Sequence, residues 1–295
     1  MSRKIAFIGL GKMGNPMAAN LARAGYQVTG FDLSPEALQE ARDNGVTPVD
    51  TVTEAVTGVD IAITMLPNGH LVDSVVTEIL SVNTDVLIID SSTIAVDEAR
   101  AIDQKVRAVG ARYIDAPVSG GMVGATNGTL AFMVGGTPEN VADAAAALDV
   151  MGRATTHCGG VGAGQAAKVC NNMILGVHQL VLAEAIALAE GLDLDLKALY
   201  EVVSNSTGAS WALTSNCPVP GIVETSPANN GFKPGFATSL MVKDLNLAMD
   251  AVAKTNTDAA LGRLATEKFT AFNEDGGAHL DFSAIVQAIR ASVNA

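Results

Sequence analysis

The chain has 295 residues, of which 48% are hydrophobic and only 17% are charged. So apolar a chain can bury a sizeable core, which excludes disorder as its main character, and its length allows one large domain or two ordinary ones. Its 18 Lys and Arg residues against 31 Asp and Glu residues give a formal charge of −13. A surface this acidic repels phosphate backbones, so we expect no nucleic-acid partner.

Cysteine usage and the first residues favour an intracellular protein. Cys158, Cys170 and Cys217 are widely spaced and form no metal-ligand cluster, so we expect no metal site and a reduced, cytoplasmic location. Ser2-Arg3-Lys4 is followed directly by a strand-like run, unlike a signal peptide. The longest apolar stretch, residues 173–189, is too polar and too short to span a membrane comfortably, so we expect a buried helix and no membrane partner.

The first half of the chain alternates strand and helix patterns. Runs rich in β-branched residues predict strands, and apolar residues at helical spacing behind capping residues predict helices. The expected strands cover residues 4–8, 26–31, 59–66, 86–89, 112–115 and 130–134, and the expected helices cover 15–24, 34–45, a short segment from 51, 96–109 and a segment opening at 137. This alternation predicts an α/β domain with a parallel, doubly wound sheet.

The second half reads as helical almost throughout. Its expected helices cover residues 165–190, 194–204, 236–255, 261–273 and 283–293. Residues 217–234 hold four prolines and two glycines, which predicts an irregular loop. We therefore expect an all-α second domain at 164–295, joined to a first domain at 1–163 by a long helix over about 165–190.

A GxGxxG pattern follows the first predicted strand and opens the first predicted helix. It consists of Gly9, Leu10, Gly11, Lys12, Met13 and Gly14. The first glycine permits the tight turn, the second lets the backbone approach a pyrophosphate, and the third lets helix and strand pack closely. Free amides and the positive end of the helix dipole favour phosphate at this point. The pattern predicts a dinucleotide-binding Rossmann domain, with a plain βα turn as the alternative.

Asp32 stands at the end of the second predicted strand, 18 residues after Gly14. A carboxylate there can accept hydrogen bonds from the adenosine ribose hydroxyls, and it would repel a 2′-phosphate. No Arg or Lys occurs in residues 33–36. We therefore expect NAD rather than NADP as the cofactor, although Asp32 could instead serve only as a helix-capping acid.

Two further loops follow predicted strands and should face the cofactor, because ligands of such sheets bind at the carboxyl ends of the strands. The first loop contains Leu66, Pro67 and Asn68, and the second ends at Thr93. Either loop could equally be an ordinary turn.

Lys168 and Asn172 are four residues apart on the predicted long helix, hence on one of its faces. A partly buried lysine is costly unless it is paired or used, and it can exchange a proton with an alcohol or a carbonyl oxygen. A surface lysine and a capping asparagine are the alternative. Ser119 with the amides of Gly120 and Gly121 could cradle a carboxylate, or could form a Ser-Gly-Gly turn without a ligand.

Four motifs in order make the whole chain resemble the β-hydroxyacid dehydrogenase family. Residues 9–21 are similar to its cofactor signature, and Asp115 to Gly121 match DxPVSGG. Residues 162–172 match GxGxxxKxxxN, and Lys243-Asp244-Leu245 matches a KDL segment, which otherwise reads as a solvated salt bridge. The resemblance implies a Rossmann domain, an all-helical second domain, a small 3-hydroxy carboxylic acid as substrate, and a homodimer or homotetramer.

The resemblance also implies a role for each candidate residue. Lys168 would be the general acid/base at the substrate hydroxyl, and Asn172 would orient the substrate. Ser119, Gly120 and Gly121 would hold the carboxylate. Thr93 and Asn68 would line the cofactor cleft, and Lys243 would reach the site near the nicotinamide. Trp211 and Phe236, in loops similar to the family's substrate-proximal segments, would offer apolar surface to a methyl-bearing substrate, or could be ordinary packing aromatics.

Two alternatives remain open, one within this family and one beyond it, and the chain is too short for a third. Another family dehydrogenase could act on tartronate semialdehyde or succinic semialdehyde, whereas 6-phosphogluconate dehydrogenase needs a much larger helical domain than this chain has. A catalytically silent dinucleotide-binding module would be a different class of protein. The presence of Lys168 and Asn172 favours hydroxyacid chemistry.

Overall fold

The computed structural model describes residues 3–293, and the chain divides into two compact units, Met1–Lys168 and Val169–Ala295. Ser2, part of the N-terminal segment interpreted above, lies outside the described residues. The division between the units falls inside the long helix, five residues after the expected boundary at residue 163, which stays a prediction.

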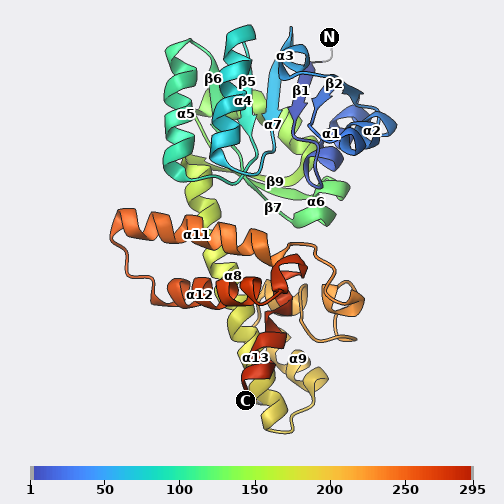
Figure 1. Ribbon diagram of the computed structural model, residues 1–295, viewed down its shortest axis with the longest axis vertical. Helices are drawn as coiled ribbons and strands as arrows, with labels where there is room; N and C mark the ends of the chain where they lie inside the picture. Colours follow the sequence, from blue (N-terminus) through green and yellow to red (C-terminus); the bar gives the residue numbers. More distant parts are fainter. Residues whose placement is uncertain (1–2, 294–295) are drawn as a thin grey trace. The chain divides into compact units, whose positions relative to one another are not determined.

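The strands described in the first unit form one sheet, in the order β3-β2-β1-β4-β5-β6-β8-β7, with β9 paired to β8 (Figure 1). Their bounds are β1 (Lys4–Ile8), β2 (Gln27–Phe31), β3 (Thr47–Pro48), β4 (Ile61–Thr64), β5 (Leu87–Asp90), β6 (Arg112–Asp115), β7 (Val118–Ser119), β8 (Leu130–Gly135) and β9 (Gly152–Gly159). β1 to β6 run parallel, and β8 runs antiparallel to β6 and β7. The order of the first six strands is that of a Rossmann fold.

Alternate residues of the strands enter two hydrophobic cores, one on each face of the sheet. Ile5 and Phe7 belong to the core that also holds residues of α1, α2 and α7, whereas Ala6 and Ile8 belong to the core with α3, α4 and α5. The helices of this unit are α1 (Gly14–Arg23), α2 (Pro35–Asp43), α3 (Val52–Val56), α4 (Gly69–Val82), α5 (Val96–Ala108), α6 (Gly121–Asn127) and α7 (Pro138–Met151). Helices on both faces explain why the strands are continuously apolar, and they confirm the predicted doubly wound fold.

Five elements of this unit were not anticipated, namely the two-residue strand β3 together with α4, β7, α6 and β9. α4 buries Val72, Val76 and Ile79, which lie at helical spacing, so the sequence did contain a signal for this helix. β7 and α6 are short. β9 is half exposed and polar, and it is a strand because it pairs with β8 at the end of the sheet.

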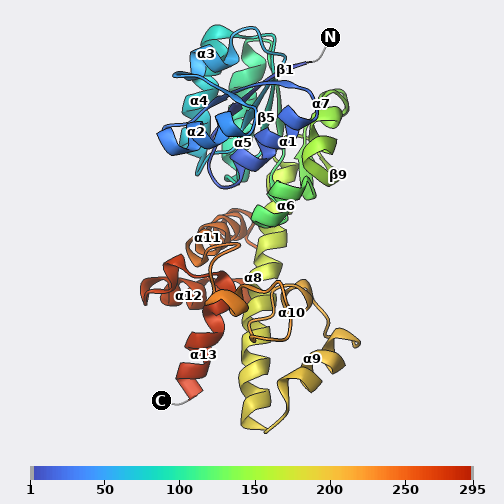
Figure 2. The same cartoon turned by 90° about the vertical axis from the view of Figure 1, so that its right-hand side faces the viewer.

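The second unit is helical, as predicted. Beyond the long helix α8 (Ala163–Gly191), its elements are α9 (Leu196–Ser204), α10 (Trp211–Thr214), η1 (Pro227–Asn230), α11 (Thr238–Thr255), α12 (Ala260–Glu274), η2 (Gly277–His279), η3 (Phe282–Ala284) and α13 (Ile285–Val293). α11 and α12 lie side by side (Figure 2), and a single hydrophobic core joins Leu180, Leu245, Phe269 and Ile285. The proline-rich stretch is irregular except for η1, which confirms the predicted loop.

α8 is one continuous helix of 29 residues, long and apolar enough to cross a membrane by length and composition. The helix agrees with the predicted span of about 165–190, and it is longer than the apolar stretch 173–189 that was judged too short, so that judgement does not hold for the helix as a whole. Under half of its most apolar stretch is buried within the protein. Its buried residues Leu182, Ala183 and Ile186 belong to the core of the second unit, as expected of a core helix.

Candidate active site

The glycine-rich turn joins β1 to α1 with backbone approaches that only glycine permits. Gly9 has a φ of +94°, and a Cβ at Gly14 would lie 1.9 Å from the carbonyl oxygen of Gly9. A Cβ at Gly11 would meet open space. The turn is therefore packed tightly against the protein at its two ends and open at its middle glycine, the arrangement that lets a pyrophosphate reach the first amides of α1.

Asp32 follows β2 and is tied to this turn. Its Oδ2 accepts a hydrogen bond from the backbone amide of Leu10 at 2.7 Å, and its Oδ1 accepts one from the amide of Ser34 at 2.8 Å. Each carboxylate oxygen has further lone pairs for a ribose hydroxyl. Capping of α2 belongs instead to Ser34, whose hydroxyl accepts from Ala37 N, so the capping alternative for Asp32 is wrong.

The loops after β4 and β5 are bonded to each other. The amide of Leu66 donates to Ser92 Oγ at 2.9 Å. Asn68, two residues further on, is the N-cap of α4, where its side-chain oxygen accepts from Leu71 N. Ser91 Oγ is buried and has no hydrogen-bond partner among residues 3–293. This hydroxyl lies just after the carboxyl end of β5, where a sheet of this kind binds a dinucleotide. A hydrogen bond to a polar group of such a ligand would satisfy it.

Beneath these loops a carboxylate is buried at the end of β5. Asp90 accepts hydrogen bonds from Thr64 Oγ1 at 2.8 Å and from the hydroxyl of Tyr113 at 3.2 Å. Loss of hydration raises the pKa of the Asp90 carboxyl to about 6, against the lowering effect of its hydrogen bonds. Neither Asp90 nor Tyr113 was singled out from the sequence, where buried and exposed acids look alike.

The first turn of α8 is anchored to the end of β6. Asp115 accepts hydrogen bonds from the amides of Gly162 at 2.7 Å and Gln165 at 2.8 Å, so it caps the helix from a distant strand. Burial raises the pKa of Asp115, which these amide bonds oppose. This contact gives a physical reason for the Asp that opens DxPVSGG.

Lys168 lies one turn further along α8 and is only 7% exposed. Its Nζ donates to the backbone carbonyl oxygen of Val118 at 2.9 Å. Ser119 follows at once, Gly120 caps α6, and α6 begins at Gly121. The structure thus places the lysine of one predicted motif against the backbone of the other, and the alternative of a surface lysine is wrong.

Asn172 is buried in the second unit and contacts the KDL segment on α11. Its Nδ2 donates to Asp244 Oδ2, and its Oδ1 accepts from Asn171 Nδ2 at 2.9 Å. Lys243 Nζ lies 3.8 Å from Asp244 Oδ1, and Asp244 is buried while Lys243 is partly exposed. The ion pair expected by default is therefore present and solvated at its lysine end, but buried Asp244 also holds the amide of Asn172 in one orientation.

The two proposed aromatic residues differ in their surroundings. Trp211, the first residue of α10, is 55% exposed. Phe236 packs edge-on against Phe282, with ring centroids 5.8 Å apart, and its amide donates to Asp281 Oδ2 at 3.0 Å. Phe236 is thus partly buried and packed against the core of the second unit, whereas the Trp211 ring is largely exposed to solvent.

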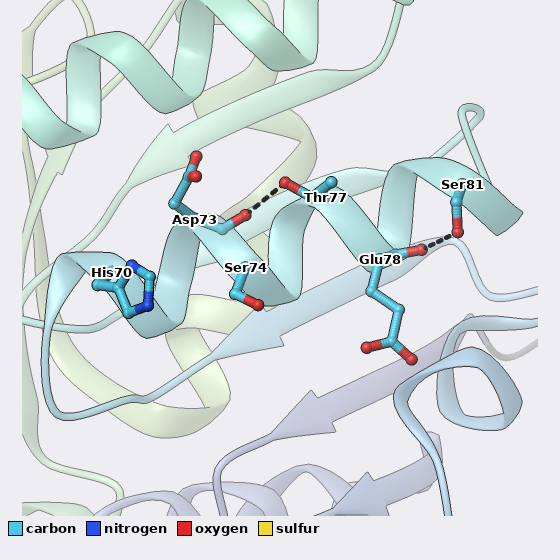
Figure 3. Close-up of a pocket in the computed structure, with 6 residues that line it drawn as sticks. All are labelled: His70, Asp73, Ser74, Thr77, Glu78 and Ser81. Atoms are coloured by element: carbon cyan, nitrogen blue, oxygen red, sulfur yellow. Dashed lines mark hydrogen bonds between the residues drawn. The ribbon is translucent and has the colours of Figure 1, made fainter.

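A surface hollow on α4 contains none of the predicted site residues. It is lined by His70, Asp73, Ser74, Thr77, Glu78 and Ser81 (Figure 3). The Thr77 and Ser81 hydroxyls donate to carbonyl oxygens of their own helix, and Lys105 pairs with Asp73. Within residues 3–293, no group of three or more His, Cys, Asp and Glu side chains could hold a metal ion. The hollow is an ordinary solvated helix face.

The Rossmann sheet, its glycine turn and the buried lysine define a nucleotide-dependent oxidoreductase. Residues 4–160 match the family described as "NAD binding domain of 6-phosphogluconate dehydrogenase", and residues 162–289 match the family described as "NAD-binding of NADP-dependent 3-hydroxyisobutyrate dehydrogenase". The chain belongs to the 3-hydroxyisobutyrate dehydrogenase family, and NAD is its cofactor.

Two curated relatives and a solved structure match nearly the whole chain. The "Probable 3-hydroxyisobutyrate dehydrogenase" of Mycobacterium bovis is 50% identical over 99% of both chains. The "NAD-dependent L-serine dehydrogenase" of Pseudomonas aeruginosa is 40% identical over 96% of both. A structure of Mycobacterium tuberculosis 3-hydroxyisobutyrate dehydrogenase with L-serine, at 50% identity, superposes with a TM-score of 0.94 over 98% of this chain and 100% of that one.

Proposed function

We propose that this protein oxidises 3-hydroxyisobutyrate to methylmalonate semialdehyde with NAD, a step of valine breakdown. Lys168, in its neutral form, takes the proton from the substrate hydroxyl as C3 loses its hydride. NAD, when bound, supplies the acceptor for that hydride. The need for a neutral amine predicts activity that rises into alkaline pH.

The other candidate residues bind and orient. Ser119 and the amides of Gly120 and Gly121 hold the substrate carboxylate, because consecutive backbone donors suit an anion. Asn172, oriented by Asp244, binds the substrate, and Lys243 lies near the nicotinamide end of the cofactor. Positioning of two reactants in this way accounts for much of the rate enhancement in such reactions.

The observation that carries this proposal is the hydrogen bond from Lys168 Nζ to Val118 O. It sets an amine beside the segment proposed to bind the carboxylate. In a 3-hydroxy acid, only two carbons separate the carboxylate from the hydroxyl. The proton acceptor for the hydroxyl must therefore lie close to the segment that binds the carboxylate.

L-Serine is a second candidate substrate, because the Pseudomonas aeruginosa relative is named for it and the mycobacterial structure is described with it. Both molecules are 3-hydroxypropionates that differ at C2, where one carries a methyl group and the other an ammonium group. Trp211 and Phe236 favour the methyl group through apolar contact. An exposed indole face can also attract an ammonium ion, so both substrates need testing.

The test is a rate screen with purified protein, NAD or NADP, and a panel of acids. The panel contains 3-hydroxyisobutyrate and L-serine for oxidation, and tartronate semialdehyde and succinic semialdehyde for reduction. The highest kcat/KM should belong to 3-hydroxyisobutyrate with NAD. A higher kcat/KM for another acid would make that acid the substrate. If none of the acids is turned over, the proposed activity is refuted and the catalytically silent dinucleotide-binding module is favoured.

We also propose that the protein is a cytoplasmic homodimer or homotetramer. Ile174, Val181 and Leu188 are spaced by seven residues on α8 and are 52%, 53% and 63% exposed. A stripe of large apolar side chains open to water is typical of an association surface. Light scattering coupled to size exclusion should give two or four times the mass of one chain, and a single-chain mass would refute this part.

A further inference from the structure

Gln165 is fully buried in the first turn of α8, three residues before Lys168. Its side-chain amide makes two hydrogen bonds to the loop after β5. Nε2 donates to the carbonyl oxygen of Ser92 at 2.8 Å, and Oε1 accepts from the amide of Ile94 at 3.2 Å. One side chain therefore clamps the backbone on both sides of Thr93.

The clamped segment is itself fixed to the sheet and to the neighbouring loop. The amide of Ser92 donates to Asp90 Oδ1 at 3.1 Å, and Ser92 Oγ accepts from Leu66 N. The two loops proposed to face the dinucleotide are thus joined to each other, and Gln165 joins both of them to the helix turn that precedes the lysine.

We propose that Gln165 is a positioning residue that couples the dinucleotide-facing loops to Lys168. The inference rests on the proposed function for the role of Lys168. The clamp, meaning the two hydrogen bonds of the Gln165 side chain to Ser92 O and Ile94 N, does not depend on that function. A glutamine suits this place because it offers a donor and an acceptor in one planar group, which the Ser92 carbonyl and the Ile94 amide both require. An apolar residue would leave both backbone groups buried and unpaired, and the loop would shift to pair them.

The experiment compares three variants by dinucleotide Kd from calorimetric titration, by kcat at saturating substrates, and by melting temperature. Gln165→Met removes both hydrogen bonds. Gln165→Glu keeps the acceptor for Ile94 N, but it sets a carboxylate against the Ser92 carbonyl until it is protonated. Gln179→Met is the matched control, because Gln179 is equally buried on α8 but contacts Asn216 in the second unit.

Gln165→Met should raise the Kd for NAD and lower kcat by about tenfold or more each, since small displacements of reacting groups are costly. Gln179→Met should leave both within about twofold of wild type. Burial raises the pKa of an introduced carboxyl, so Gln165→Glu should bind NAD nearly as wild type does near pH 6 and much more weakly near pH 8.5.

A lower melting temperature with unchanged Kd and kcat would show a purely structural Gln165 and overturn the proposal. A raised Kd with unchanged kcat would overturn the coupling to Lys168. If Gln165→Met does not fold, the pH dependence of NAD binding by Gln165→Glu decides, and a Kd ratio to wild type that is the same at both pH values refutes the clamp. If wild type oxidises no acid of the panel, the proposed function fails while the NAD titrations still test the clamp.

Discussion

The amine of Lys168 donates a hydrogen bond to the backbone carbonyl of Val118, 50 residues away in the sequence. The bond joins the short strand β7, which follows β6, to the first turns of α8. Asp115 makes a second connection between the same regions by capping the helix. The position of the proposed proton acceptor is therefore set by the sheet of the first unit.

Lys168→Ala should lower kcat by about a thousandfold, which is within the range for loss of a general base. NAD binding should change little, because Lys168 contacts the segment proposed for the substrate rather than the glycine turn. Steady-state kinetics and calorimetric titration with NAD measure the two effects, and Lys197→Ala, on the exposed face of α9, is the control. Near-normal turnover by Lys168→Ala would remove Lys168 from the mechanism. The activity of wild type should rise toward alkaline pH, and that of Lys168→Ala should not.

Asp32→Ser should reduce the preference for NAD over NADP by about tenfold or more, because it removes the charge that repels a 2′-phosphate. Loss of the bond to Leu10 N should also weaken binding of both dinucleotides. The measurement is the ratio of kcat/KM for NAD to that for NADP. Asp43→Ser, at an exposed position of α2, should leave the ratio unchanged. An unchanged ratio in Asp32→Ser, or a wild type that prefers NADP, would contradict the assignment.

Asp244→Leu should lower kcat/KM for the hydroxyacid by about tenfold or more, since a buried amide loses its charged acceptor. Asn172 is then free to rotate away from the substrate. Asp244→Asn keeps an acceptor oxygen for Asn172 and should recover part of the loss. Asp250→Asn, on the exposed side of α11, is the control. If Asp244→Leu matches wild type in kcat/KM, Asp244 does not orient Asn172.

Asp90 should make stability depend on pH in an unusual direction for a carboxylate. Burial raises its pKa from 3.8 to about 6, so the folded state binds this proton more tightly than the unfolded chain does. Its stabilising contribution is complete below pH 4 and is lost as pH rises through 6, by about 3 kcal/mol for a shift of about two pKa units.

Asp90→Asn cannot ionise, so between pH 4 and pH 7 its free energy of unfolding should fall by about 2 kcal/mol less than that of wild type. Urea denaturation at several pH values measures the difference. Asp85→Asn, at the exposed turn before β5, should follow the wild-type curve. Parallel curves for wild type and Asp90→Asn would show that Asp90 has an ordinary pKa.

Local patterns were enough to predict most of the fold. β1 is a continuous apolar run that ends at a glycine, α2 has a capping Ser34 followed by a first-turn proline, and α8 has apolar residues at helical spacing; the structure confirms each of them. β9 could not be found in this way, because its residues are polar and it is a strand only through its pairing with β8. Such pairing depends on residues distant in the sequence, which a local pattern does not report.

The candidate site was predictable as a set of residues but not as a set of contacts. Motif spacing singled out Lys168, Asn172 and Asp32, whose assigned roles stay predictions. Their partners Val118, Asp244 and Leu10 lie in the same motifs, but nothing in the sequence shows which residue each one contacts, and two of them act through backbone atoms. Gln165 was missed because a buried glutamine and a solvated one look the same in sequence; its position in a run of small residues was the available clue.

The capping of α8 by Asp115 separates the position of the Lys168 amine from the choice of substrate, so mutations can change the second without the first. Lys168 is held by Val118 and by a helix start that Asp115 fixes, all within the first unit, whereas Trp211 and Phe236 belong to the second. If Trp211 and Phe236 have the substrate-binding role proposed for them, their replacement would alter which group at C2 is accepted without displacing the amine proposed to take the proton. A lineage could thus exchange one hydroxyacid for another through mutations in the helical unit alone, while it inherits its chemistry unchanged.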